Sequence, residues 1–205
     1  MALYQISDRK KLADYFRRDL PMHAYSLGDL DDFHWPKTTY YGEIQGEELS
    51  RVILLYRGEG LPVLLALGQE GFFRDDYYRS LAPLLPDSFY AHFSPGVEKF
   101  FSKDFEITDH GKHYKMSLVE PGSLGSVSPD SAFQLNDTHL SELLNLYHQS
   151  YPENAFDPQM LSTGKYFGCR SGEVLVSVAG VHVYSSCYRV AALGNITTHP
   201  DHRNQ

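Results

Sequence analysis

Cysteine is scarce in this sequence of 205 residues, because Cys169 and Cys187 are the only two. Their spacing matches neither a disulfide framework nor a zinc site, and it indicates a reducing compartment. Long apolar runs are missing too, since none approaches the ~20 residues that a membrane helix needs. Met1 to Leu20 mixes charge throughout, unlike a signal peptide. We therefore expect a cytoplasmic protein without a membrane partner.

Positive charge is also in short supply. The chain has 18 Lys and Arg against 26 Asp and Glu, which gives a formal net charge of −8. A general nucleic-acid binder carries a basic stripe, so this balance argues against a nucleic-acid partner. The composition of 42% hydrophobic and 21% charged residues is that of a globular protein. Its length fits one generous domain or two compact ones.

The first half of the chain alternates helical and strand patterns. A helix is expected from Ser7 to Pro21, and residues 22–38 are expected to be irregular, with Phe33 and Trp35 filling the core. The acidic residues Asp29, Asp31 and Asp32 are expected on a solvated face. Further elements follow from apolar spacing and turn residues: strands 39–44, 51–56, 63–67 and 89–93, helices around 73–81 and from Ser94, and a hairpin of 105–108 with 114–119.

A stretch rich in Gly, Ser and Pro, residues 120–130, is the best linker candidate. After it, apolar residues at helical spacing predict a helix that Pro152 ends: Leu140, Leu143, Leu144, Tyr147 and Tyr151. A shorter helix is expected at 157–161. Strands are then expected at 165–170 and 174–184, with a bulge at Ala179-Gly180 where the apolar parity changes. The two halves thus share an order of helix, irregular segment and three antiparallel strands.

The most informative stretch is the last, residues 187–205. Small and apolar residues on alternate positions predict a strand that ends at His199-Pro200: Val190, Ala192, Gly194, Ile196 and Thr198. A polar turn that contains Arg203 follows. A strand that leaves a sheet into such a turn is how phosphate-binding loops begin, because backbone N–H groups there face an anion. Taken without any resemblance, the same residues also fit an edge strand with a solvated polar tail.

The sequence of residues 195–205 resembles the fourth strand and acyl-CoA loop of the GNAT acyltransferase superfamily. It reads Asn195-Ile196-Thr197-Thr198-His199-Pro200-Asp201-His202-Arg203-Asn204-Gln205. Arg203 is similar to the first residue of the family signature Arg/Gln-x-x-Gly-x-Gly/Ala, with Asn204 and Gln205 at its variable positions. The signature glycines are expected next. The resemblance therefore implies a GNAT-type N-acetyltransferase whose sequence is truncated inside the CoA pyrophosphate loop, so that its ligand site is incomplete.

The resemblance also implies a site. Main-chain groups of Ile196, Thr197 and Thr198 are expected to bind the pantetheine arm of acetyl-CoA, and Arg203, Asn204 and Gln205 to begin the pyrophosphate loop. No catalytic residue is assigned, because residues 187–198 contain no Asp or Glu and the usual tyrosine acid is expected beyond Gln205. Asn195 fits either a water-orienting role or a structural hydrogen bond. His110 with His113, and His199 with His202, lack an evident third ligand, so no metal is expected.

The fold class implied is α/β with a mixed α+β sheet. Residues 1–125 resemble a degenerate GNAT-like domain, and residues 131–205 resemble the N-terminal half of a second one, as in tandem members similar to glycine N-acyltransferases. The expected function is transfer of an acyl group, most plausibly acetyl, from acyl-CoA to a small-molecule or peptide amine. The alternative is a non-catalytic pseudo-acyltransferase that acts as a binding or assembly module. A homodimer that covers the C-terminal strand is an expected partner arrangement.

Overall fold

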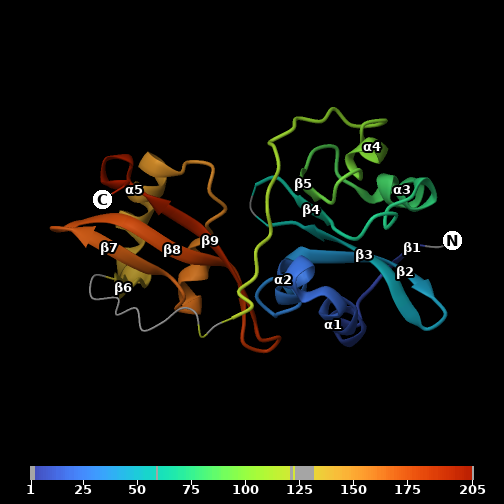
Figure 1. Ribbon diagram of the computed structural model, residues 1–205, viewed down its shortest axis with the longest axis horizontal. Helices are drawn as coiled ribbons and strands as arrows, with labels where there is room; N and C mark the ends of the chain where they lie inside the picture. Colours follow the sequence, from blue (N-terminus) through green and yellow to red (C-terminus); the bar gives the residue numbers. More distant parts are fainter. Residues whose placement is uncertain (1–2, 59, 121, 123–131, 205) are drawn as a thin grey trace. The chain divides into compact units, whose positions relative to one another are not determined.

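The computed structural model describes residues 3–58, 60–120, 122 and 132–204. The chain divides into two compact units, Met1–Ser117 (unit 1) and Leu118–Gln205 (unit 2). Each unit contains one sheet and its own helices (Figure 1). The predicted α/β class with a mixed sheet is confirmed, because the sheet of unit 1 combines antiparallel and parallel pairs. The predicted linker at 120–130 lies almost entirely outside the described residues.

Unit 1 is built on a five-stranded sheet in the order β1-β2-β3-β4-β5. Neighbouring strands are antiparallel except β4 and β5, which run parallel. A parallel pair needs a crossover, and here the chain makes it through α3. The elements are β1 (Leu3–Gln5), α1 (Arg9–Phe16), α2 (Leu20–Gly28), β2 (Thr38–Gln45), β3 (Glu48–Tyr56), β4 (Val63–Ala66), α3 (Asp75–Leu81), β5 (Tyr90–Phe93) and α4 (Glu98–Phe101).

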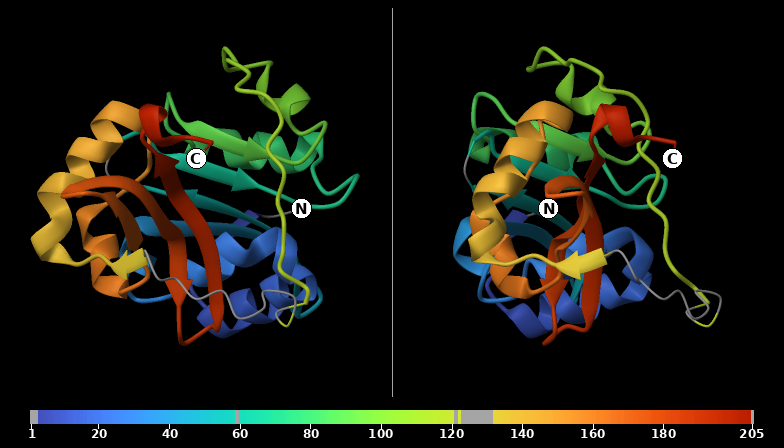
Figure 2. Two further views of the ribbon diagram at one scale, coloured as in Figure 1. Left: turned by 60° about the vertical axis from the view of Figure 1, so that its left-hand side comes forward. Right: turned by 90° about the vertical axis from the view of Figure 1, so that its left-hand side faces the viewer.

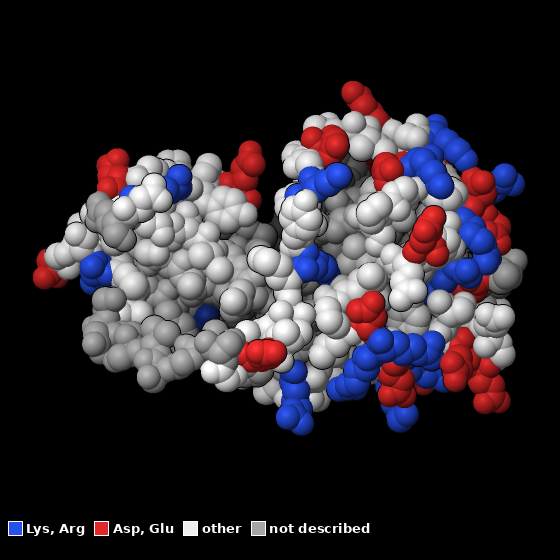
Figure 3. Space-filling model, viewed as in Figure 1, with Lys and Arg blue, Asp and Glu red and all other residues white. Residues whose placement is uncertain are grey.

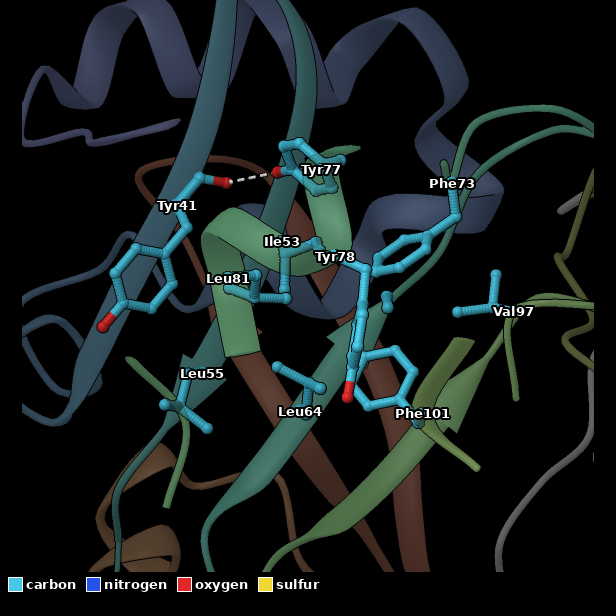
Figure 4. Packing of buried hydrophobic residues seen from close by; sticks show 11 residues of the cluster. Tyr41, Ile53, Leu55, Leu64, Phe73, Tyr77, Tyr78, Leu81, Val97 and Phe101 are labelled. Carbon is cyan, nitrogen blue, oxygen red and sulfur yellow. Dashed lines mark hydrogen bonds between the residues drawn. The ribbon is translucent and has the colours of Figure 1, made fainter. Parts of the chain in front are cut away.

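One face of this sheet is covered by α3 and α4. Alternate residues of the strands, among them Tyr41, Ile53 and Leu64, pack against aromatic side chains of the helices and the loop before α3 (Figure 4). Phe73 lies at the centre, with ring contacts to several neighbours. The hydroxyl of Tyr77 donates to the main-chain oxygen of Tyr41 at 3.1 Å, which fixes α3 on β2.

The opposite face is covered by α1 and α2. Tyr40 alternates with Tyr41 on β2, and its ring lies 5.8 Å from Phe16 of α1 and is stacked on Trp35 at 5.7 Å. Trp35 is only half-buried, because the guanidinium of Arg9 covers its outer surface at 4.4 Å. The tryptophan therefore closes the edge of this layer rather than filling its centre.

Several local expectations for unit 1 are wrong. Asp8, not Ser7, caps α1. Pro21 does not end the helical region, because it occupies the first turn of α2, where its missing N–H is not needed. The segment 22–38 therefore contains a helix. The predicted hairpin of 105–108 with 114–119 is absent from the described residues, which form no strand there. The turn residues around Gly111 indicated a hairpin, but nearly all residues on either side are exposed, so no buried apolar face stabilises paired strands there.

Asp29 also differs from the expectation of a solvated acidic face. It is 7% exposed at the end of α2, and its Oδ1 lies 3.8 Å from Nδ1 of the buried His34. Burial raises the pKa of the Asp29 carboxyl to about 8. Burial likewise lowers the pKa of His23, on the same helix, to about 4. Unit 1 thus holds two titratable groups whose uncharged forms are favoured by folding.

Unit 2 has a four-stranded antiparallel sheet in the order β6-β7-β8-β9, with α5 along one face (Figure 2). Tyr147 and Leu143 of α5 face this sheet and are buried, whereas Leu144 and Tyr151 of the predicted apolar stripe are exposed. The elements are β6 (Ala132–Gln134), α5 (Leu140–Ser150), the 3₁₀ segment η6 (Pro158–Thr163), β7 (Phe167–Ser171), β8 (Val174–Ser185), β9 (Val190–Thr198) and the 3₁₀ turn η7 (Pro200–His202).

The two units repeat one order of elements. In each, a short strand is followed by helical segments and then by three antiparallel strands. The strand order β1-β2-β3-β4 of unit 1 corresponds to β6-β7-β8-β9 of unit 2, so β9 occupies the position of β4. The repeated order that the sequence indicated is therefore present. The opening strands β1 and β6 were missed, because three residues are too few to show a period.

The buried Asp29 generates a prediction about pH. Its folded pKa of about 8 lies above the unfolded value of ~3.9, so the folded protein binds more protons between these values and stability falls as pH rises. His23 has the opposite slope, but only below pH ~6.5. Between pH 6.5 and 8 the free energy of unfolding should fall by about 1–2 kcal/mol in the wild-type protein and stay nearly constant in Asp29→Asn.

The measurement is urea unfolding at pH 6.5 and pH 8, followed by the fluorescence of Trp35, the single tryptophan of the chain. Asp31→Asn serves as the control, because Asp31 has the same chemistry without the deep burial. An equal pH slope in wild type and Asp29→Asn would contradict the assignment.

Candidate functional site

The central feature of β9 is a bulge. The register with β8 pairs Thr197 with Val178 and then Gly194 with Gly180, so that Asn195 and Ile196 together oppose Ala179. Asn195 adopts a left-handed conformation with φ of 53°, which asparagine tolerates better than most residues. The predicted irregularity at Ala179-Gly180 is confirmed, although the extra residue lies on β9. The bulge changes the direction in which the end of β9 points.

A buried polar network holds this bulge. The Tyr147 hydroxyl donates to the main-chain oxygen of Asn195 at 2.7 Å, and Asn195 Nδ2 donates to the Tyr166 hydroxyl at 2.9 Å. Tyr166 in turn donates to the main-chain oxygen of Val181 at 2.8 Å. Burial raises the pKa of Tyr147 above its ordinary value and that of Tyr166 to about 12, so both hydroxyls keep the proton they donate.

One atom of the network has no partner in the described part of the chain. Asn195 is 2% exposed, and its Oδ1 accepts no hydrogen bond there. A buried acceptor left unpaired costs about 1–3 kcal/mol. The Nδ2 atom of Asn195 therefore makes a structural hydrogen bond, whereas its Oδ1 atom lowers the stability of unit 2. Packing alone does not explain why this unpaired oxygen is buried.

Beyond the bulge, the main-chain groups of β9 alternate in direction. The His199 N–H donates to the Val176 oxygen at 2.8 Å, so Thr197, two residues earlier, also faces β8. The main-chain groups of Ile196 and Thr198 therefore face away from β8, at the edge of the unit 2 sheet as described. The Ile196 side chain is 53% exposed, and the Thr198 hydroxyl lies 2.9 Å from that of Ser177.

The turn after β9 returns to the strand. His199 caps η7 by accepting from the Asp201 N–H at 3.3 Å, and Arg203 Nε donates to the main-chain oxygen of Thr198 at 3.0 Å. Asn204 has a positive φ of 61°. Arg203 and Asn204 are both exposed, and Gln205 lies outside the described residues. The predicted residues Ile196, Thr198 and Arg203 are thus brought together at one end of β9.

Arg203 is a prominent charge in its surroundings, because the sequence from 118 to 205 contains few cations. They are Lys165, Arg170, Arg189 and Arg203. Arg170 is paired with Glu142 at 2.6 Å, and the Lys165 ammonium lies over the Tyr184 ring. On the face shown in Figure 3, blue side chains gather over unit 1 and are sparse over unit 2. An anion at the end of β9 would therefore meet mainly Arg203 and main-chain N–H groups.

The other candidates from the sequence are not assembled into sites. His110 lies against Tyr90 and His113 against His92, while His199 and His202 contact each other. Among the described residues, no group of three or more His, Cys, Asp or Glu is placed to hold a metal ion. Cys169 is half-buried in β7 and Cys187 is exposed, and both are free thiols.

The loop after β4 in unit 1 occupies the position that η7 has in unit 2, and its own side chains fill it. The ring of Phe72 lies against Gly68, where an added Cβ would meet it at 2.2 Å. Glu43, 2% exposed, pairs with Arg51 and, at 3.4 Å, with Arg74, while Arg51 Nε donates to the Phe72 oxygen at 2.6 Å. Sequence reasoning missed Arg74, because only the fold shows that Glu43 binds it.

No family model matches the chain, and no curated protein does. Among solved structures, an "Acetyltransferase from GNAT family from Colwellia psychrerythraea" is similar, with a TM-score of 0.46 and 13% sequence identity over 100% of this chain and 80% of that one. Within the described residues, no helix is both long and apolar enough for a membrane crossing.

The close packing beneath the bulge generates a prediction. A Cβ at Gly180 would lie 2.2 Å from the ring of Tyr166, which is fully buried and held by hydrogen bonds. Gly180→Ala should therefore destabilise unit 2 by about 3 kcal/mol, the upper end of the cost of overpacking. Gly172→Ala is the control: it has open space but a positive φ, and should cost about 1 kcal/mol.

Amide hydrogen exchange of β8 and β9 measures both variants, since the single tryptophan lies in unit 1. Equal protection in the two variants would show that the Tyr166 ring moves aside without cost.

Proposed function

We propose that this chain is an acyl-CoA-dependent N-acyltransferase that transfers an acyl group, acetyl in the first instance, to a small-molecule or peptide amine. The observation that carries the proposal is the end of β9, where the outward main-chain groups of Ile196 and Thr198 run directly into the turn that holds Arg203. We interpret this geometry as an acyl-CoA site because the sequence of residues 195–205 resembles the GNAT acyl-CoA loop.

In this proposal the pantetheine arm lies along the outer edge of β9 and pairs with Ile196 and Thr198. Thr197, whose main-chain groups face β8, contributes by holding the strand in register. The guanidinium of Arg203 has five N–H donors and uses one on Thr198, so others can bind a diphosphate. Asn204, with its positive φ, continues the loop toward the anion. Gln205, which lies outside the described residues, remains a predicted member of the loop.

The reaction requires positioning more than side-chain chemistry. The amine nitrogen attacks the thioester carbonyl carbon, the new C–N bond forms, and the C–S bond breaks to release the CoA thiol, which takes up the proton that the amine loses. The carbonyl oxygen becomes negative in the tetrahedral intermediate, and a main-chain N–H near the end of β9 stabilises it. We assign no general base, because β9 carries no acidic residue.

We propose that unit 1, within the predicted domain 1–125, is a degenerate copy that does not bind acyl-CoA. Its loop after β4 is filled by Phe72, and its arginines are engaged by Glu43 and the loop backbone. Unit 2, within the predicted domain 131–205, carries the ligand-binding half. The repeated order of elements supports this division of roles.

Binding of acetyl-CoA tests the function. At about 100 times its dissociation constant, the ligand should stabilise unit 2 by about 2.7 kcal/mol in a thermal unfolding experiment. Arg203→Ala should weaken binding about tenfold, because it removes a charge-assisted hydrogen bond to the diphosphate. Arg79→Ala is the control, since it deletes an exposed arginine on α3 of unit 1 and should leave the affinity unchanged.

S-acetylpantetheine, which lacks the diphosphate, separates the two parts of the ligand. Its affinity should be the same for wild type and Arg203→Ala. Absence of any shift with acetyl-CoA would reject the transferase and favour the non-catalytic binding module.

We also propose that a second copy of the chain covers the N-terminal half of β9. The strand VAALGNITT carries no charge or proline to protect its edge, and Leu193 is 73% exposed. The bulge at Asn195 separates this half from the proposed ligand-binding end. Leu193→Lys should convert a dimer to a monomer in light scattering after size exclusion, whereas a monomeric wild-type protein would reject the dimer.

A further inference from the structure

The buried network at Asn195 is placed where the proposed thioester site begins. Its members come from separate elements, with Tyr147 on α5, Tyr166 just before β7, and Asn195 on β9. Phe156 fills the space between the two tyrosines, with ring distances of 5.2 and 5.4 Å. The helix layer and the sheet of unit 2 are therefore joined at a residue whose backbone is left-handed.

The network acts on the backbone rather than on a ligand. Tyr147 binds the main-chain oxygen of Asn195, and Tyr166 binds its side-chain nitrogen, so the residue is held at both ends. Rotation of Asn195 toward ordinary strand geometry would remove the bulge and shift the following residues by one position. In a strand, the main-chain groups of successive residues point to opposite edges, so such a shift exchanges those that face β8 with those that face away. Ile196 and Thr198 would then face β8.

The unpartnered Oδ1 of Asn195 is a second and independent observation. This buried acceptor has no hydrogen bond within the described part of the chain. Buried polar atoms are normally paired, because an unpaired one lowers the stability of the fold. Unsatisfied polar atoms and left-handed residues are retained where surrounding contacts impose them, and they cluster at functional sites. The cost here is located directly before the proposed ligand-binding residues.

We propose that Tyr147, Tyr166 and Asn195 are positioning residues for the acyl thioester. They hold the bulge that turns the main-chain groups of Ile196 and Thr198 toward the pantetheine arm, and they do not contact the ligand themselves. This inference rests on the proposed function, and it adds the device that sets the direction of the ligand-binding edge.

The test compares two tyrosine hydroxyls that bind main-chain oxygens in different units. Tyr147→Phe removes the bond to Asn195, and the matched control Tyr77→Phe removes the bond to Tyr41 in unit 1. Both substitutions delete one buried hydroxyl and keep the ring. Titration with acetyl-CoA and with S-acetylpantetheine should show about tenfold weaker binding of both ligands by Tyr147→Phe, and unchanged binding by Tyr77→Phe.

The ligand pattern distinguishes positioning from general damage to the loop. Loss of Arg203 affects only the ligand that carries the diphosphate, whereas loss of the Tyr147 bond affects the arm that both ligands share. Amide exchange gives a readout without ligand: protection at residues 195–198 should fall at least fivefold in Tyr147→Phe and stay constant in Tyr77→Phe.

Three results would overturn the inference. Equal affinities in wild type and Tyr147→Phe, with a wild type that binds, would reject the positioning role and leave the proposed function standing. Unchanged exchange at 195–198 would show that the bulge does not depend on the hydroxyl. A wild-type protein that binds neither ligand would reject the proposed function and this inference with it.

Discussion

The hydrogen bond from the Tyr147 hydroxyl to the main-chain oxygen of Asn195 is the contact on which the geometry of the candidate site depends. It joins α5 to β9 at a left-handed residue, and this fixes the bulge in the strand. Because the bond is buried, it competes with little water, and its loss would leave a main-chain oxygen unpaired. The direction of the next residues, and hence the ligand-binding edge, follows from this one constraint.

The two units show how one order of elements gives different chemistry. Both place a fourth strand before a loop, and in both the fold brings an arginine to that loop. In unit 1, Glu43 binds Arg74 and Arg51, and Phe72 fills the loop beside Gly68. In unit 2, Arg203 is exposed, and among the contacts described it binds only the main-chain oxygen of Thr198, the last residue of β9. The difference lies in a few side chains, while the topology is shared.

Regular elements with clear periods were predicted well. The helix at 140–150 and the strands at 174–185 and 190–198 were found close to their expected bounds, because apolar spacing reflects the face that a sheet or a neighbouring helix buries. The helix α2 and the strands β1 and β6 were missed. The helix α2 was missed because a proline such as Pro21 fits both the end of one helix and the first turn of the next. The strands β1 and β6 were missed because three residues form a strand only through their pairing in the sheet.

By itself, the sequence determined the fold class, the order of strands after each helix, the parity change near Ala179, and the run of residues that resembles an acyl-CoA loop. These are local properties, since hydrophobic spacing and turn residues act over a few positions. Only the tertiary structure decided that Asp29 is buried, that Glu43 binds Arg51 and Arg74, and that two tyrosines hold Asn195 in its bulge. Those facts join residues 5 to 48 positions apart, and burial and hydrogen bonding at that range depend on how the layers pack.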